Sequence, residues 1–138
     1  MDLNECFRKG LIKKTTKDSG LIKSLKEMAD NKEMTIKRAT LDNISISTYV
    51  SIAYDSLREI LEGICILHEY KTISHVCIGE LLRDMLKEFN FEEFDRIRWI
   101  RNGINYYGEQ VELEQGKDLI IIIFNMKHEM SKKLRDIK

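Results

Sequence analysis

The stretch YVSIAYDSLREILEGICIL, from Tyr49 to Leu67, decides the fold. Its apolar side chains recur every three or four positions, which is the spacing of one face of an α-helix. The residues of this face are Tyr49, Val50, Ala53, Leu57, Ile60, Leu61, Ile64 and Leu67, and Ile52, Cys65 and Ile66 widen it. So wide an apolar surface predicts a central helix that other elements cover on more than one side. Ser45 or Ser47 is its expected N-cap, because a hydroxyl there can accept a hydrogen bond from a free N–H of the first turn.

Segments on both sides of this stretch repeat the helical period. A one-sided amphipathic helix is expected from about residue 17 to residue 40, where apolar side chains stand among lysines and glutamates. After the central helix, Ser74 is the expected N-cap of a further helix, which ends at a turn around Asn90. The next helix starts with the acids of FEEFD and ends at Gly108, an order of charge and cap that suits the helix dipole.

The segment VELEQGKDLIIIIFNM, residues 111–126, fits two local structures. Its β-branched and apolar residues around a glycine fit a hairpin. An isolated two-stranded hairpin is only marginally stable, however, and the apolar residues that follow continue at mostly helical spacing. These residues are Phe124, Met130, Leu134 and Ile137. We therefore expect a helix that is surrounded on several sides over residues 119–123.

The first residues, 1–16, form a short extension before the main body. Leu3, Phe7 and Leu11 recur at helical spacing, so a short helix that packs on the body is expected. The chain contains no proline, the residue that normally interrupts helices. Together the segments predict an all-α protein: an up-and-down bundle of four to five helices plus the short N-terminal helix, in a single domain over residues 1–138.

The charges of the chain balance, with 23 basic and 23 acidic side chains. This balance argues against broad electrostatic binding to nucleic acid or to an anionic membrane, although it leaves room for a local basic site. No apolar run is long enough to span a bilayer, and the start MDLNECFRKGLIKK lacks the apolar core of a signal peptide. We expect a cytoplasmic protein with no membrane partner.

The three cysteines, Cys6, Cys65 and Cys77, are odd in number and form no CxxC pair. They predict neither a disulfide framework nor a zinc site, and we interpret them as small apolar side chains. His68 and His75 lie close to two of them in the sequence, but these spacings straddle a helix break. We expect no metal and no cofactor.

The polar stretch RIRWIRNGINYYGEQV, from Arg96 to Val111, is the candidate site. At about 100° per residue, Arg101 falls within or at the edge of the apolar arc of its helix rather than on the wet face. A guanidinium there needs a partner, which is either an acid of the central helix, Asp55 or Glu59, or an anion in a shared cleft. The expected anion-binding residues are Arg98, Arg101, Asn102 and Asn105.

Two strings in the sequence resemble a known family. AYDSLREILEGICILHEYKTISH, residues 53–75, and IRNGINYYGE, residues 100–109, are similar to the HEPN domain family, and within it to small prokaryotic proteins related to nucleotidyltransferase substrate-binding subunits. The resemblance covers roughly residues 17–138. It implies a bundle of four or five helices that is usually paired into a dimer.

The resemblance also implies a site, but the motif is degenerate. In active members of the family an Arg is followed after four to six residues by a His, and two such pairs across a dimer interface cleave RNA without a metal. Arg101 and Asn102 match the start of this motif, whereas Tyr106, Tyr107 and Gly108 occupy the positions available for the His. An imidazole exchanges protons near neutral pH, but an ordinary tyrosine has a pKa of about 10 and is a poor replacement.

Two functions are therefore open. The first is a HEPN-like homodimeric binding module whose Arg101 region binds a nucleotide, an RNA phosphate or a partner nucleotidyltransferase in a toxin–antitoxin context. The second is an enzyme, a metal-independent ribonuclease in which Tyr106 or Tyr107 replaces the His after a neighbouring guanidinium has lowered its pKa. The missing His favours the binding module.

The opposite face of the same helix predicts the dimer contact. Trp99, Gly103 and Tyr106 gather there, two aromatic residues flanking a residue with no side chain. A glycine costs a helix up to about 1 kcal/mol relative to alanine, so the close approach of another helix is a reason to have one. We expect the partner subunit on this face, and the alternative is a helix of the same chain.

Overall fold

The computed structural model describes residues 1–135. Ile137, which the sequence analysis counts with the last helix, lies outside these residues. Over this range the chain forms six α-helices and two short strands. In chain order these are α1 (Leu3–Arg8), β1 (Ile12–Lys14), α2 (Ser19–Arg38), α3 (Ile46–Leu67), β2 (Tyr70–Thr72), α4 (His75–Met85), α5 (Phe91–Tyr107) and α6 (Leu113–Ser131), followed by a 3-10 turn (Lys132–Leu134). The all-α prediction is confirmed.

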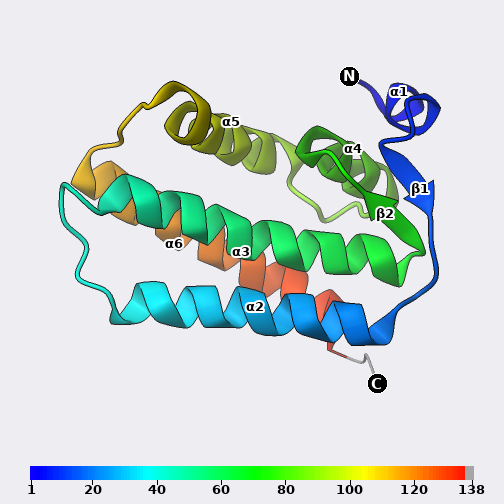
Figure 1. The fold of residues 1–138 in the computed structure, drawn as a ribbon, viewed down its shortest axis with the longest axis horizontal. Coiled ribbons are helices and arrows are strands. Elements are labelled where there is room, and N and C mark those ends of the chain that lie inside the picture. The colour runs from blue at the N-terminus through cyan, green and yellow to red at the C-terminus, as the bar shows by residue number, and fades with distance from the viewer. Residues whose placement is uncertain (136–138) are drawn as a thin grey trace.

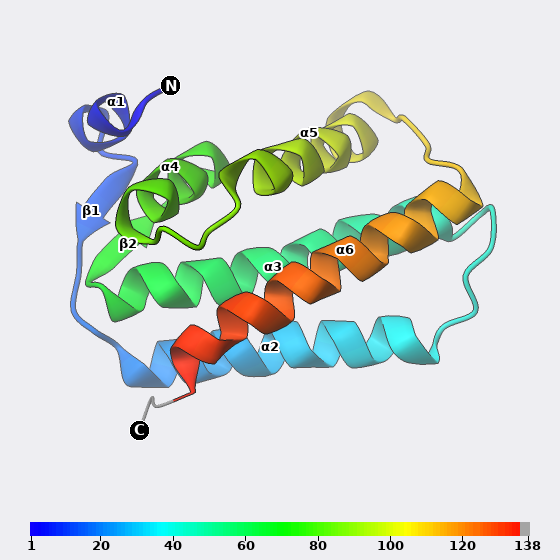
Figure 2. The ribbon, with the colours of Figure 1, turned by 180° about the vertical axis from the view of Figure 1, so that it is seen from behind.

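The long helices alternate in direction around α3. Figure 1 shows α2 below α3 and the α4–α5 pair above it, and Figure 2 shows α6 lying along α2 and α3 from behind. The central helix is therefore covered on several sides, as its wide apolar surface predicts. The up-and-down bundle of five helices plus a short N-terminal helix is the architecture expected from the sequence.

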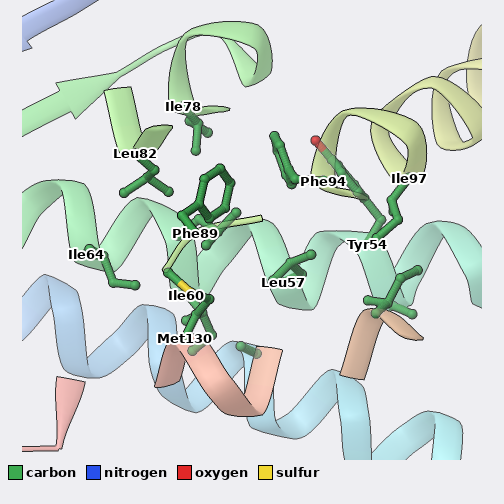
Figure 3. Packing of buried hydrophobic residues seen from close by; sticks show 14 of the residues in the cluster. Tyr54, Leu57, Ile60, Ile64, Ile78, Leu82, Phe89, Phe94, Ile97 and Met130 are labelled. Carbon is green, nitrogen blue, oxygen red and sulfur yellow. The ribbon is translucent and has the colours of Figure 1, made fainter. Parts of the chain in front are cut away.

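The core forms where α3 meets its neighbours. Its α3 residues alternate by three and four positions, so they share a face, and side chains from α4, α5 and α6 close over them (Figure 3). The buried residues labelled there are Tyr54, Leu57, Ile60, Ile64, Ile78, Leu82, Phe89, Phe94, Ile97 and Met130. This layer fixes α5 against α3 and so positions the polar side chains described below.

Local signals set several helix ends. The Ser74 side chain accepts a hydrogen bond from the Cys77 N–H and caps α4, and Gly108, at φ 67°, ends α5 in the left-handed region. Ser45 precedes α3, but its hydroxyl accepts from the Asp42 N–H instead of capping the first turn. The caps of α4 and α5 are thus confirmed, and the hydroxyl cap expected for α3 is wrong.

The ambiguous segment is a helix, α6, as expected. Leu119, Ile120 and Ile123 are buried, while Ile121 is 59% exposed, so the helix is covered over much of its circumference at mid-length. None of the helices within residues 1–135, α6 included, is long and apolar enough to cross a bilayer.

The N-terminal extension differs from the expected helix in its second half. α1 ends at Arg8, Gly10 takes a positive φ of 72°, and the chain then continues as β1. β1 pairs antiparallel with β2, with Ile12 opposite Thr72, and the side chain of Ile12 is only 3% exposed. The helical spacing of Leu11 was misleading, because pairing with a distant strand buries Ile12 and satisfies the backbone.

A disulfide joins Cys6 of α1 to Cys77 of α4, contrary to the prediction of three unpaired cysteines. Their Cα atoms are 5.8 Å apart although the residues are 71 positions apart in the chain. The β1–β2 pairing brings α1 and α4 together, and no spacing in the sequence predicts this contact. Cys65 is the free cysteine, and burial raises the pKa of its thiol to about 12. Disulfides are rare in the cytosol, so the bond counts against the expected cytoplasmic location.

Candidate functional site

Two polar stripes face each other where α5 packs on α3. Apart from the neighbours Tyr54 and Asp55, successive members of each stripe are three or four positions apart and therefore share one side of their helix. On α3 they are Ser51, Tyr54, Asp55, Arg58 and Glu62, on α5 they are Asp95, Arg98, Arg101 and Asn105, and His75 at the start of α4 completes the set. We call these residues the Arg101 cluster.

Arg101 lies deep in this cluster with few partners. It is 9% exposed, and its Nη2 is 3.4 Å from Oδ1 of Asp55, the longer end of a hydrogen bond. The guanidinium carbon lies 5.2 Å from the ring centroid of Tyr54 and 5.9 Å from that of Tyr106. Its Nη1 is buried without a hydrogen-bond partner among residues 1–135. Of the two acids predicted to pair with Arg101, Asp55 is confirmed, while Glu59 binds Lys32 at 2.8 Å.

Asn105 completes the surroundings of Arg101. With its amide oxygen turned towards Arg101, Asn105 accepts hydrogen bonds from Nε and Nη2 of the guanidinium at 3.1 Å each. In the same orientation its amide nitrogen donates to the Ser51 hydroxyl at 2.8 Å. Asn102, grouped with these residues from the sequence, is half-buried on α5 outside this set of contacts.

The other two guanidiniums are better paired. Nη1 of Arg58 is 2.7 Å from Glu62, and Arg98 donates to Asp95 from Nη2 at 2.8 Å and from Nε at 3.1 Å. Both of these carboxylates are one turn from their arginines on the same helix. Nε of Arg58 is nevertheless buried without a hydrogen-bond partner among residues 1–135, as Nη1 of Arg101 is, so Arg101 differs from the other two in having no hydrogen bond to a carboxylate shorter than 3.4 Å.

Tyr54 and His75 form a second pair inside the cluster. The Tyr54 hydroxyl and Nδ1 of His75 are 3.1 Å apart, and Tyr54 is fully buried. Burial raises the pKa of the Tyr54 hydroxyl. The pKa of His75 is lowered to about 4, first because the ring is partly buried and then because Arg58 and Arg101 add positive charge. His75 is therefore a neutral imidazole near pH 7, and it reports a positive field at this site.

Sequence reasoning missed this pair because it weighed His75 only as a metal ligand. Cys77, its neighbour in that hypothetical metal site, is in the disulfide, and Cys65 is buried in the core. No group of three potential His, Cys, Asp or Glu ligands is placed to hold a metal ion within the described part of the chain. No local motif links Tyr54 to His75, since they lie on different helices.

The outer face of α5 is open in the single chain. Trp99 is 62% exposed and Tyr106 is 69% exposed, so the alternative that another helix of the same chain covers them is wrong. Gly103 is nevertheless buried, because the side chain of Glu109 folds back onto it and a Cβ there would collide with the carboxylate. In the single chain, the space at Gly103 is thus taken by the side chain of Glu109, and the close approach of a partner helix stays a prediction.

A third buried cation besides Arg98 and Arg101, Lys127 on α6, was not among the predicted residues. It is 1% exposed, and its Nζ lies 2.7 Å from Glu33 and 2.8 Å from Asp30 on α2. Burial by itself would raise the pKa of Glu33, but hydrogen bonds from Lys127, Lys37 and His128 outweigh it and lower the pKa to about 2. Lys127 follows Ile123 and Phe124 at helical spacing, and this signal places it on the buried face. We call this set the Lys127 cluster.

Comparison of the chain with models of protein families, with curated proteins and with solved structures gave no match. The HEPN resemblance therefore stays a prediction from two short strings. The function has to be argued from the geometry of the Arg101 cluster itself.

Proposed function

We propose that this protein is a homodimeric binding module whose Arg101 cluster binds a phosphate group of a nucleotide or of RNA. One observation carries the proposal: the buried guanidinium of Arg101 has an unpartnered Nη1 and only a long contact to a carboxylate. An unpaired donor on a buried cation is costly, and a phosphate is the anion whose oxygens suit a guanidinium best. The low pKa of His75 supports the proposal, since it reflects a positive field from Arg58 and Arg101 after the effect of burial.

Tyr106 controls access to Arg101 in this proposal. Its ring lies over the guanidinium, yet the side chain is 69% exposed and so is free to swing towards solvent. A rotation of that side chain opens a path to Arg101 from outside. The ring then becomes a surface on which a base of the ligand can stack.

The exposed aromatic residues of α5 are the proposed contact with the partner subunit. Trp99 is large and open, and aromatic residues are enriched at interface centres, whereas Tyr106, two turns later and beside Arg101, lies at the edge of the proposed contact. Pairing through this face brings two Arg101 regions near one symmetric cleft. A partner nucleotidyltransferase in a toxin–antitoxin pair remains part of the proposal, as does a cytoplasmic location, although the Cys6–Cys77 disulfide is unusual there.

Binding is tested by calorimetric titration of the protein with AMP and with a short oligo(A) RNA. Arg101→Gln should weaken binding at least about tenfold, because a charge-assisted bidentate contact is lost. Arg96→Gln is the matched control, since Arg96 is an exposed arginine on the same helix, paired with Glu93 at 3.1 Å. Equal affinities for wild type and Arg101→Gln, or no binding of either ligand, would contradict the proposal.

The ribonuclease remains the second candidate, and the Tyr54–His75 pair is the observation that favours it. A neutral imidazole hydrogen-bonded to a hydroxyl can accept or pass on a proton close to the arginines. The assay is RNA cleavage in the presence of a chelator. Cleavage that is lost in Arg101→Gln and in either Tyr106→Phe or His75→Gln would establish the enzyme in place of the binding module.

The dimer is tested separately by light scattering. Trp99→Glu should convert a dimer into a monomer, because it places a charge at the centre of the proposed interface. Ile44→Glu is the control, since Ile44 is 93% exposed in the α2–α3 connection and is not part of α5. A wild-type protein that is monomeric at micromolar concentration refutes the interface.

A further inference from the structure

The two-stranded sheet carries a local excess of positive charge. From Arg8 to Lys17 the chain has five basic side chains and no acidic one, although its overall charges balance. β2 adds a further lysine, and in the register of the sheet Lys13 stands directly opposite Lys71. We call Lys13, Lys14, Lys17 and Lys71 the basic ribbon. It lies at the end of the bundle opposite to the α2–α3 and α5–α6 connections (Figure 1).

The ribbon lysines are not neutralised by their neighbours. None of the four forms an ion pair within residues 1–135, because the acids nearby are engaged elsewhere. Glu5 pairs with Lys9 at 3.6 Å, Glu62 binds Arg58 at 2.7 Å, and the Asp18 side chain caps α2. Glu69, exposed at the start of the turn into β2, is the remaining carboxylate beside the ribbon.

Stability does not explain this arrangement. Like charges directly opposite each other on two strands destabilise the pair, and a sheet of two three-residue strands is marginal even without them. Features that break a local rule are expected where they serve a function. The Lys13–Lys71 pair is such a feature.

The ribbon is also held rigidly. The Cys6–Cys77 disulfide joins the helix before β1 to the helix after β2, so both strands are tied at the same end. On the other face of the sheet, Nζ of Lys14 lies 4.7 Å from the ring centroid of Tyr70. A surface whose shape is fixed in advance loses little entropy when it binds a ligand.

We propose that the basic ribbon binds the phosphate backbone of a single-stranded nucleic acid. Lys13 and Lys71 share one face of the sheet and Lys17 follows β1 by three residues, so about three lysines can contact phosphates of one strand, while Lys14 lies on the other face at the Tyr70 ring. Lysines contact phosphates without reading bases, so binding is independent of sequence. The surface suits a membrane less well, since the exposed apolar residues beside it, Phe7, Leu21 and Ile73, are few and stable anchoring needs deeper apolar insertion. The inference goes beyond the proposed function and does not depend on Arg101.

The test is the salt dependence of binding to a fluorescein-labelled oligo(U) RNA of about 12 nucleotides, followed by fluorescence anisotropy. With about three phosphate contacts, the slope of log K against log salt should be about −2.1, so affinity falls about 20-fold between about 50 and 200 mM salt. Lys13→Gln with Lys71→Gln should reduce the slope to about −0.7, a fall of about threefold over the same range. The melting temperature of this variant should equal or exceed that of the wild type, because a like-charge pair is removed.

Lys117→Gln with Arg38→Gln is the matched control, since it removes two exposed positive charges at the other end of the bundle. It should leave the slope at the wild-type value. In an Arg101→Gln background the ribbon substitutions should cause the same loss of slope, which separates this inference from the proposed function. The inference is overturned if the wild type does not bind the RNA at about 50 mM salt. It is also overturned if the control lowers the slope as much, if the ribbon effect vanishes without Arg101, or if the protein binds phosphatidylserine vesicles and not RNA.

Discussion

Two of the buried cations of this bundle, Lys127 and Arg101, differ in how completely they are paired. Lys127 lies between α2 and α6 with two carboxylate oxygens at 2.7 and 2.8 Å. Arg101 lies between α3 and α5 with one carboxylate oxygen at 3.4 Å, the Asn105 amide oxygen at 3.1 Å, two aromatic rings and a nitrogen that has no partner among residues 1–135. The burial of the two is similar, at 1% and 9% exposure, so burial alone does not separate a structural cation from a binding one.

The difference points to different roles. A fully paired buried ion pair fixes how two helices sit against each other, and the loss of one member leaves the other charge stranded. An incompletely paired cation next to an exposed aromatic side chain can exchange its weak contacts for a ligand. The Lys127 cluster should therefore govern stability, and the Arg101 cluster should govern binding.

The largest effect is expected from Lys127→Met. It removes the buried cation and leaves Glu33 only its two exposed partners, Lys37 and His128, so the free energy of unfolding should fall by about 3 to 5 kcal/mol. Urea denaturation measures this free energy of unfolding. Lys117→Met, which breaks an exposed pair with Glu114, should change it by no more than about 0.5 kcal/mol. Similar changes in the free energy of unfolding for the two variants would show that Lys127 is not a structural cation.

The next effect is a loss of folding stability at acidic pH. The folded pKa of Glu33, about 2, lies below its ordinary value of 4.5, so the unfolded state binds the proton first as the pH falls. The stabilisation is complete above about pH 4.5 and is lost progressively towards about pH 2, in total about 3 kcal/mol. Unfolding free energies measured across this window should fall less steeply in Glu33→Gln than in wild type. Glu27→Gln, an exposed position on the same helix, should retain the wild-type slope.

A smaller pH effect belongs to the Arg101 cluster and falls in a different window. The folded pKa of His75, about 4, lies below its ordinary 6.5, so the unfolded state takes up the proton first here as well. Stability should fall by about 2 kcal/mol between about pH 7 and pH 5, and the fall should disappear in His75→Gln. His68→Gln, at an exposed histidine, is the control. Equal pH profiles for the two variants would show that His75 titrates freely.

The smallest stability effect is expected from Arg101→Met. Asp55 keeps Arg58 at 3.6 Å and remains partly exposed, so no charge is stranded and the loss should be about 1 kcal/mol. Urea denaturation of Arg101→Met beside Lys127→Met measures the contrast directly. A loss as large as that of Lys127→Met would mean that Arg101, too, is a structural cation.

The sequence predicted the parts of the fold that depend on neighbouring positions. The periodic apolar residues of α3 and α5, the cap at Ser74 and the end at Gly108 are all local signals, and the structure agrees with each of them. The same counting placed Arg101 on the buried side of α5 and named Asp55 as a partner. Helical phase is sufficient for such inferences, because it fixes which side chains face the core.

The predictions that were wrong or missing concern contacts between distant segments of the chain. β1 is strand-like only because β2 lies beside it, and Cys6 meets Cys77 only after that pairing has formed. The closeness of Tyr54 and His75 likewise follows from the packing of α4 on α3. Lys127 could have been found, since the helical count that located Arg101 also places this lysine on the buried face of α6.

The Cys6–Cys77 bond turns the first half of the protein into a covalent ring. β1, α2, α3 and β2 lie inside this ring, whereas α5 and α6 lie outside it. The α2–α3 connection, where Ile44 is 93% exposed, is the natural place for a protease to cut within the ring. A molecule cut there keeps its full mass on a gel run without reductant and separates into two fragments when the disulfide is reduced. A nick in this loop would therefore leave α2 attached to the rest of the bundle, and the two halves could come apart only after thiol exchange.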